Sequence, residues 1–259
     1  MTGTVLLERQ EHVAHVIFNR PEVLNAINNE FAVDLSAICD TLANDAGVWL
    51  VVLRGAGDRA FSAGADLKAR RDMTPEQWSE QRGLLRSMFE KLRTLPQPMI
   101  AAVHGYALGG GTELAMLADI IVASDDAVFG LTEVSLGIIP GGGGTQYLAR
   151  LIGRNRAKEL IFSARRIPAS EALSLGLVNR VVARADLLPA VSELAEEILR
   201  NSPFAVRQAK WAIDQGTDLP LADGFQKEHE AYLRAIASND RQEGISAFNE
   251  KRRPRFTGT

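Results

Sequence analysis

Three glycine-rich segments are the parts of this sequence best suited to chemistry. They read AFSAGADLK at residues 60–68, GYALGGGTELA at residues 105–115 and IIPGGGGTQ at residues 138–146, and each is expected at a strand-to-helix junction. Glycine permits positive φ angles and close approach of a ligand, and the first helical turn leaves N–H groups without acceptors. One such loop could be a tight connection and nothing more. Three together favour sites that bind an anion or stabilise an oxyanion.

Two glutamates lie beside these loops. Glu113 directly follows the run GGGT, and Glu133 lies within FGLTEVSLGIIP. Taken singly, Glu113 could be a first-turn acid that favours the helix dipole, and Glu133 could be a solvated loop residue. An ionised carboxylate in a segment as apolar as that around Glu133 is costly unless it has a task or a partner. Both are therefore candidate functional groups.

Several other kinds of site are disfavoured. The patterns GxxxxGK[ST], GxGxxG, GxSxG and HExxH do not occur. Four scattered histidines argue against a metal cluster. Lys+Arg number 29 and Asp+Glu 32, so a formal net charge of −3 supplies no overall positive field for nucleic acid. We expect the single cysteine, Cys39, to be a small buried hydrophobe.

The length and composition indicate one globular unit. A chain of 259 residues that is 46% hydrophobic and 24% charged suits one large domain or one domain with an appended lobe. The apolar run at residues 5–7 is too short for a signal-peptide core. Residues 95–112 lack charge but contain prolines and glycines, which makes a poor membrane span. We expect a soluble, cytoplasmic protein with no membrane partner.

Short strands and amphipathic helices must position the glycine loops. The alternation at residues 12–19 predicts a strand, and apolar runs at 49–53, 99–103 and 120–123 predict buried strands that end at turn residues. Apolar residues recur at helical spacing over residues 28–44. The chain is therefore expected to be α/β, with strand, strand, helix units stacked in a spiral.

The pattern changes to helices after about residue 187. Ser202 is expected to cap one helix that Gly216 ends, Pro220 to start the next, and Asp240 with Glu243 to form a capping pair for the last. We expect a core over residues 1–200 and a helical lobe over residues 201–259. The apolar faces at residues 187–198 and 225–236 need a surface to cover, either the chain's own core or a second subunit, and of the two we expect a subunit interface.

Four motifs in order resemble the enoyl-CoA hydratase/isomerase family, the crotonase superfamily. They are AFSAGADLK, GYALGGGTELA, FGLTEVSLGIIPGGGGTQ and the closing AFNEKR, and the resemblance runs from FNRP at residues 18–21 to the C-terminus. It implies a crotonase-like spiral of β-β-α units with a C-terminal helical trimerisation lobe. The implied assembly is a homotrimer or a dimer of trimers.

The resemblance also implies a reaction and the residues that perform it. By motif position, the N–H groups of Ala65 and Gly110 would hold the thioester oxygen of an acyl-CoA. Family hydratases have a glutamate at each of two positions, which Glu113 and Glu133 fill here. Glu113 would activate water for C3 of a 2-enoyl thioester and Glu133 would protonate C2. No metal or redox cofactor is implied, because coenzyme A is part of the substrate.

Contacts to coenzyme A are implied in the first glycine loop and near the C-terminus, the latter from a neighbouring subunit. The expected substrate-binding residues are Ala63, Ala65, Asp66, Leu67, Lys68, Gly110, Phe248 and Lys251. For Asp66 a turn or cap role is favoured over that of a third catalytic acid, and the basic tail around Lys251 could be merely solvated. Residues 68–93 are expected to lie over the acyl pocket.

Finer assignments remain open. KELIFSAR, KWAIDQG and FNEKRRPRF are similar to the methylglutaconyl-CoA hydratase branch, whose branched acidic substrate would suit a cation such as Arg70, Arg71 or Arg82. A Δ3,Δ2-enoyl-CoA isomerase is the main alternative. A nucleic-acid-binding homologue is disfavoured because the helix at residues 28–44 contains no Lys or Arg and three acids. Fatty-acid and amino-acid degradation are both compatible with these motifs.

Overall fold

The chain alternates between two β-sheets as it advances. The structure is a computed structural model and describes residues 3–259. The larger sheet has the order β1 (Val5–Gln10), β2 (Val13–Phe18), β3 (Leu50–Gly55), β5 (Met99–Val103), β7 (Ile120–Ser124) and β10 (Arg180–Val182). The smaller has the order β4 (Ala60–Ser62), β6 (Tyr106–Leu108), β8 (Val128–Gly130) and β9 (Ile167–Pro168). Within the described strands, β1–β2 and β8–β9 are antiparallel and the other neighbours are parallel.

Three successive strand pairs build a spiral. In β3–β4, β5–β6 and β7–β8 the first strand joins the larger sheet and the second joins the smaller one. The helices that follow are α2 (Leu67–Arg70), α3 (Pro75–Arg93), α4 (Gly110–Met116), α5 (Gly144–Ile152), α6 (Arg154–Ser163) and α7 (Ala169–Leu175). The predicted strand, strand, helix units are confirmed. The third glycine segment is an exception, because a 3-10 turn (Glu133–Leu136) and a loop separate β8 from α5.

The first helix and the central strands match the sequence pattern closely. Helix α1 covers Asn29–Ala43, and the Asn28 side chain caps it by accepting a hydrogen bond from the N–H group of Phe31. Strand β5 has the predicted bounds, and β7 is one residue longer than predicted. Cys39 is buried as expected, and burial raises the pKa of its thiol to about 12.

The larger sheet is buried on both faces, which explains its continuous apolar runs. In β3, Val51 and Leu53 face the main core with α1 and α3, whereas Leu50 and Val52 face α8 (Leu187–Leu199). The expectation that residues 187–198 form a subunit interface is therefore wrong. Their apolar face covers the chain's own sheet, and no sequence pattern distinguishes these two uses of an amphipathic helix.

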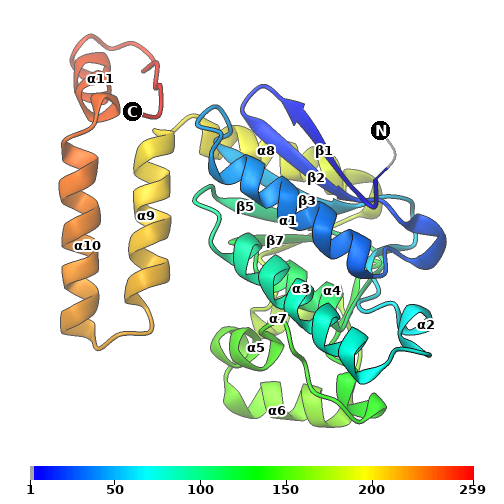
Figure 1. Ribbon diagram of the computed structural model, residues 1–259. Helices are drawn as coiled ribbons and strands as arrows, with labels where there is room; N and C mark the ends of the chain where they lie inside the picture. Colours follow the sequence, from blue (N-terminus) through cyan, green and yellow to red (C-terminus); the bar gives the residue numbers. More distant parts are fainter. Residues whose placement is uncertain (1–2) are drawn as a thin grey trace.

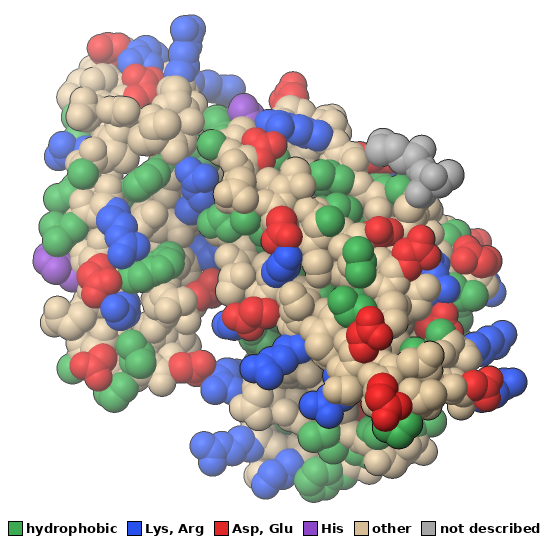
Figure 2. Space-filling view, viewed as in Figure 1, with side chains coloured by type: hydrophobic (Ala, Val, Ile, Leu, Met, Phe, Trp, Pro, Cys, Tyr) green, Lys and Arg blue, Asp and Glu red, His purple; other side chains and the backbone are tan. Residues whose placement is uncertain are grey.

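Three further helices form a lobe beside the body of the protein (Figure 1). They are α9 (Pro203–Gly216), α10 (Leu221–Ile236) and α11 (Asn239–Asn249). The Lys210 ammonium of α9 lies 2.5 Å from Asp119 on the body, which ties the two parts together. Helix α10 leaves Leu221, Phe225 and Tyr232 largely exposed, and Figure 2 shows apolar side chains at the surface of this lobe.

The caps of these helices follow the sequence in one case and depart from it in another. Ser202 caps α9 as expected, since its hydroxyl accepts a hydrogen bond from the Ala205 N–H group. Helix α11 begins two residues earlier than predicted and is capped by Ser238. The Asp240 carboxylate instead accepts hydrogen bonds from the C-terminal tail at Thr257, so the predicted Asp240–Glu243 capping pair is wrong. No helix within residues 3–259 is long and apolar enough to cross a membrane.

Candidate active site

A cavity of about 870 Å3 gathers the predicted catalytic residues. It is bounded by α3, by the loops after β4 and β6, and by the segment that follows β8. The catalytic and coenzyme A-binding residues predicted from sequence that line it are Ala63, Ala65, Leu67, Gly110, Glu113 and Glu133. The spiral brings them together because β4, β6 and β8 are parallel neighbours whose carboxyl ends share one edge.

Glu113 lies in the first turn of α4 and is buried. Its Oε1 atom accepts hydrogen bonds from the N–H groups of Gly142, at 2.7 Å, and Gly144, at 2.8 Å. Burial raises the pKa of this carboxyl, and the two N–H groups oppose that rise. The third glycine segment thus binds an anion, as its composition indicated, but the anion is a side chain of the same protein. Sequence analysis did not find this pairing, and the glycine run was its only signal.

Glu133 begins the 3-10 turn after β8. Its Oε2 atom is buried and has no hydrogen-bond partner among the described residues. Burial raises the pKa of this carboxyl to about 7, an effect that its own backbone N–H group opposes and the charge of Glu113 reinforces. A β-carbon on Gly109 would lie 3.1 Å from Glu133 Oε1, so this carboxyl lies against the second glycine loop. Glu133 can therefore carry a proton near neutral pH.

Two main-chain N–H groups complete this wall of the cavity. Among the residues that the structure describes, neither the Ala65 nor the Gly110 N–H group donates a hydrogen bond to another residue. The two loops touch at Gly64, whose φ is +82°: a β-carbon there would lie 2.5 Å from the Leu108 carbonyl oxygen and 3.0 Å from the Gly110 nitrogen. Only glycine allows this contact, which brings the two free donors to one cavity.

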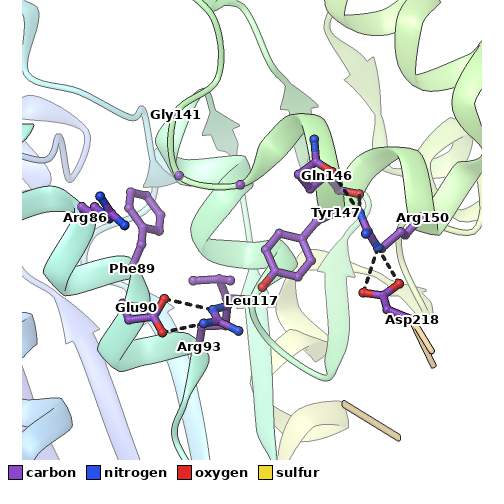
Figure 3. A pocket seen from close by; sticks show the side chains of 12 residues that line it. Arg86, Phe89, Glu90, Arg93, Leu117, Gly141, Gln146, Tyr147, Arg150 and Asp218 are labelled. Carbon is purple, nitrogen blue, oxygen red and sulfur yellow. Dashed lines mark hydrogen bonds and ion pairs between the residues drawn. The ribbon is translucent and has the colours of Figure 1, made fainter. Parts of the chain in front are cut away.

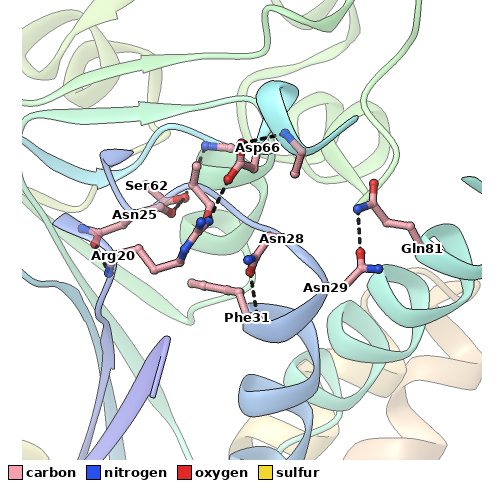
Figure 4. A network of polar contacts seen from close by, with 11 residues as sticks. Arg20, Asn25, Asn28, Asn29, Phe31, Ser62, Asp66 and Gln81 are labelled. Carbon is pink, nitrogen blue, oxygen red and sulfur yellow. Dashed lines mark hydrogen bonds and ion pairs between the residues drawn. The ribbon is translucent and has the colours of Figure 1, made fainter. Parts of the chain in front are cut away.

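Asp66 has a structural part in the first glycine loop. Its carboxylate caps α2 by accepting a hydrogen bond from the Ala69 N–H group and forms an ion pair with Arg20 at 3.0 Å (Figure 4). Burial alone would raise the pKa of Asp66. The hydrogen bonds from Ala69 and Arg20 outweigh that effect, so the pKa lies below its usual value. The predicted cap is confirmed, and Asp66 does not line the cavity.

The remaining coenzyme A contacts expected from sequence lie outside the cavity. Lys68 is exposed on α2. Phe248 is 83% exposed on α11, and Lys251 follows that helix. Figure 1 places α11 at the far end of the lobe from α2. One chain therefore does not bring Phe248 and Lys251 to the cavity, and their contact with a ligand would need a neighbouring subunit.

Helices α2 and α3 supply another part of the lining and hold a network of polar contacts that the sequence did not predict. The Arg70 guanidinium lies 4.8 Å from the centre of the Trp78 ring, and its Nε atom donates a hydrogen bond of 2.7 Å to Gln81. The buried Gln81 amide donates in turn to Asn29 of α1 at 2.6 Å (Figure 4). This chain of contacts ties α2 and α3 to α1.

Three arginines line the cavity on this side: Arg70 and Arg82, which the sequence indicated, and Arg86, which it did not. Arg71 is exposed and does not line the cavity. None of the three lining arginines forms an ion pair within the described part of the chain. The cavity lining thus contains two carboxyls together with three arginines that form no ion pair in the described chain.

The model of the family described as enoyl-CoA hydratase/isomerase matches residues 8–259. The chain belongs to this family. The resemblance stated from its four motifs is confirmed, and the chain is of the enoyl-CoA hydratase type within the crotonase superfamily.

Relatives of this family member match over almost their whole length. The short-chain-enoyl-CoA hydratase of Clostridium acetobutylicum is 42% identical over 97% of this chain and 96% of that protein. The crotonyl-CoA hydratase of Syntrophomonas wolfei is 39% identical over 97% of each. The crystal structure of an enoyl-CoA hydratase from Bacillus anthracis superposes with a TM-score of 0.96 at 44% identity, covering 99% of this chain and 100% of that one. The spiral seen here is therefore the crotonase fold.

Proposed function

We propose that this protein adds water across the 2,3 double bond of a 2-enoyl-CoA thioester and releases a 3-hydroxyacyl-CoA, as a hydro-lyase. The observation that carries the proposal is the cavity wall in which Glu113, Glu133 and two free main-chain N–H groups meet. Hydration needs a base for water, an acid for carbon and donors for the thioester oxygen. All three are present at this wall.

The reaction can be followed atom by atom. The N–H groups of Ala65 and Gly110 donate hydrogen bonds to the thioester oxygen as negative charge develops on it. Glu113 accepts a proton from water while the water oxygen bonds to C3 and the π electrons move toward C2. The protonated Glu133 then gives its proton to C2. The 3-hydroxyacyl-CoA leaves, and proton exchange with water restores both glutamates.

The surroundings of the two carboxyls favour this division of roles. Two N–H groups stabilise the ionised form of Glu113 at Oε1 and leave Oε2 for a water molecule. Only the backbone N–H group of Glu133 itself stabilises its charged form, and burial raises the pKa of this carboxyl to about 7. Two carboxyls with surroundings this different can divide the roles of base and acid in one step.

A direct assay tests the proposal. Crotonyl-CoA mixed with the protein should lose its conjugated-enoyl absorbance as 3-hydroxybutanoyl-CoA forms. A parallel assay with a 3-enoyl-CoA tests the isomerase alternative, since isomerisation would make that absorbance appear without water addition. Conversion of the 3-enoyl thioester with no hydration of crotonyl-CoA would replace the hydratase proposal.

A finer proposal concerns the acyl group: a branched substrate with a distal carboxylate, such as 3-methylglutaconyl-CoA. It is supported by the three lining arginines that lack carboxylate partners in the described chain. Arg70 ranks first because it is half-buried and held by Gln81 and Trp78. Arg70→Met should lower kcat/KM for the carboxylate substrate about 10–100-fold more than for crotonyl-CoA. Arg71→Met, outside the cavity, is the matched control and should not alter that ratio.

We also propose that the protein works as a homotrimer or dimer of trimers, with Phe248 and Lys251 reaching the coenzyme A of a neighbouring subunit. The exposed apolar residues of α10 and the 83% exposed Phe248 support a covered surface on the lobe. Sedimentation should show a trimer or hexamer. A stable monomer with full activity would contradict the assembly and leave the chemistry standing.

A further inference from the structure

Polar side chains gather at two further places in the molecule. One is the rim of a cavity of about 380 Å3 between α3 and α5, where Arg93 pairs with Glu90 at 2.5 Å and Arg150 pairs with Asp218 at 2.8 Å (Figure 3). These side chains are about half exposed, and exposed ion pairs contribute little. The other is a buried network centred on Asn25, which has no part in the mechanism above.

Asn25 makes hydrogen bonds with nearly every polar group that it has. It is fully buried, and its φ of +54° lies in the left-handed region, which few residues other than glycine and asparagine adopt. Its side-chain amide donates to the carbonyl oxygens of Ala56, at 3.0 Å, and Ala60, at 2.8 Å. Its Oδ1 atom accepts from the Arg20 N–H group at 2.9 Å, and its carbonyl oxygen accepts from the Ser62 hydroxyl at 2.8 Å (Figure 4). A conformation this uncommon, held by this many bonds, points to a position that must be kept.

Ile27, two residues after Asn25, forms a short parallel bridge with Ala65 of the first glycine loop. The Ile27 N–H group donates to the Gly64 carbonyl oxygen at 2.8 Å, and the Ile27 carbonyl oxygen accepts from the Asp66 N–H group at 2.9 Å. These two bonds flank Ala65 without using its N–H group. Neighbouring N–H groups of an extended chain point to opposite sides, so the Ala65 N–H group points away from Ile27 and is left for the cavity that Ala65 lines.

Asn25 fixes this bridge from behind. Through Ala60 it is tied to β4, the strand that leads into the glycine loop. Ser62 ties it to the loop itself, because the hydroxyl that donates to Asn25 also accepts a hydrogen bond from the Gly64 N–H group at 3.3 Å. The N–H groups on either side of Ala65 therefore have acceptors inside the protein.

We propose that Asn25 is a positioning residue for the oxyanion: its side chain holds residues 24–27 against the first glycine loop and thereby aims the Ala65 N–H group at the thioester oxygen. The inference rests on the proposed function, because it concerns a donor assigned there. Asn25 does not line the cavity and acts through Ile27. Its loss should therefore weaken polarisation of the thioester carbonyl more than it weakens binding.

The test measures how strongly the protein polarises a bound thioester. Hydrogen bonds to a carbonyl oxygen lower its stretching frequency, so butanoyl-CoA with an isotope label at the thioester carbonyl should show a downward infrared shift on binding to the wild type. Asn25→Gly removes the side chain at a φ that glycine adopts freely, and it should lose at least about half of this shift. Its kcat for crotonyl-CoA should fall about 10–100-fold, with KM changed less than about threefold.

Two further variants make the result specific. Ser62→Ala removes one hydroxyl and should lose a smaller part of the shift, and it decides the question if Asn25→Gly does not fold. Gln97→Ala is the matched control, because Gln97 is also buried and donates to a main-chain oxygen, that of Leu42 at 2.7 Å, but does not line the cavity. This control should lose stability and keep the carbonyl shift. A full wild-type shift in the deciding variant, or an equal loss in Gln97→Ala, would overturn the proposal.

Because butanoyl-CoA is saturated, the infrared measurement does not depend on the proposed reaction. If the protein fails to hydrate crotonyl-CoA but Asn25→Gly loses the carbonyl shift, the proposed function fails and the positioning role stands. If hydration proceeds and the variant keeps the shift, the positioning role fails alone. A wild type that binds butanoyl-CoA with no carbonyl shift would overturn the assignment of the oxyanion donors and this inference with it.

Discussion

The N–H group of Gly144 donates a hydrogen bond of 2.8 Å to Oε1 of Glu113, across 31 residues of sequence. Gly144 is the first residue of α5, so its N–H group has no acceptor within the helix and donates to a buried carboxylate instead. The contact fixes the carboxylate and favours its charged form. The same bond opposes the rise in the pKa of Glu113 that burial causes, and it positions the carboxylate before substrate binds.

The first prediction concerns the two glutamates. Glu113→Gln and Glu133→Gln keep size and hydrogen bonding but cannot exchange a proton near neutral pH. Each should lower kcat for crotonyl-CoA by roughly 10²–10⁴-fold with little change in acyl-CoA binding. The double variant should lose far less than the product of the two single losses, since both carboxyls serve one transition state. Stopped-flow absorbance and calorimetry measure the two quantities.

The contrast between the variants distinguishes hydration from isomerisation. A hydratase needs both carboxyls, whereas moving one proton between C2 and C4 needs a single base. If Glu113→Gln hydrated crotonyl-CoA at the wild-type rate while Glu133→Gln had no activity at all, the two-carboxylate mechanism would be wrong.

The second prediction is a pH profile. Because the pKa of Glu133 is raised to about 7, its proton is present below that pH and is lost as the pH rises through it. We expect kcat/KM for crotonyl-CoA to fall about tenfold per unit above about pH 7. Glu133→Gln should lose this alkaline limb from its residual rate. A wild-type rate that is flat to pH 9 would show that Glu133 is not the proton donor.

Stability should follow the same titration. A carboxyl with a higher pKa in the folded than in the unfolded state stabilises the fold at low pH, and this contribution is lost as pH rises from the unfolded value near 4.5 through about 7. The wild type should therefore lose stability over this interval and Glu133→Gln should not. The free energy of unfolding of the variant minus that of the wild type should increase as the pH rises. Urea titrations at pH 4.5 and 8 measure the difference.

The sequence predicted the elements whose signals are local. Asn28 with the apolar spacing after it predicted α1, and the charge-free run at residues 99–103 predicted β5. The apolar surroundings of Glu133 also predicted a costly carboxylate, and its Oε2 atom is buried without a hydrogen-bond partner in the described chain. Each of these signals lies within the segment that it describes.

Contacts between distant segments could not be predicted in this way. The bond from Gly144 to Glu113, the Gln81–Asn29 contact and the burial of α8 on the sheet depend on which segments the fold brings together. Asp240 shows the same limit, since its spacing to Glu243 suggests a cap but the C-terminal tail takes its carboxylate. Local pattern gives the elements, and the packing decides what their side chains contact.

The third prediction tests the contact that aligns the two N–H donors. Gly64→Ala would force a β-carbon against the Leu108 carbonyl and the Gly110 nitrogen. Displacing one donor should lower kcat for crotonyl-CoA about 10²–10³-fold. The activity should be divided by the folded fraction, measured by circular dichroism.

Gly176 offers a matched control for the backbone strain. Its φ of +84° is close to that of Gly64, but the nearest atom to an added β-carbon is the Leu151 carbonyl oxygen at 3.9 Å. Gly176→Ala should cost about 1 kcal/mol of stability and leave kcat unchanged. Equal losses of kcat in both variants would attribute the effect to strain alone.

The last prediction concerns the two lysines expected at coenzyme A. Lys68→Ala and Lys251→Ala should each raise KM for crotonyl-CoA several-fold and leave kcat nearly intact, because phosphate contacts far from the reacting carbons contribute uniform binding. Added salt should raise KM of the wild type in the same way. A loss of kcat at constant KM would contradict the proposed orientation of the substrate.

Mixed oligomers show which subunit supplies each lysine. Lys251 follows α11 on the lobe, whereas Lys68 lies on α2 beside the cavity of its own chain. When Glu113→Gln subunits are co-assembled with Lys251→Ala subunits, only the Lys251→Ala subunits retain working active sites. A neighbouring Glu113→Gln subunit supplies a native Lys251, which should return the KM of those sites toward the wild-type value. The same mixing with Lys68→Ala subunits should not lower KM, because Lys68 serves its own site. Rescue of Lys68→Ala, or no rescue of Lys251→Ala, would reverse the assignment of these residues to the two subunits.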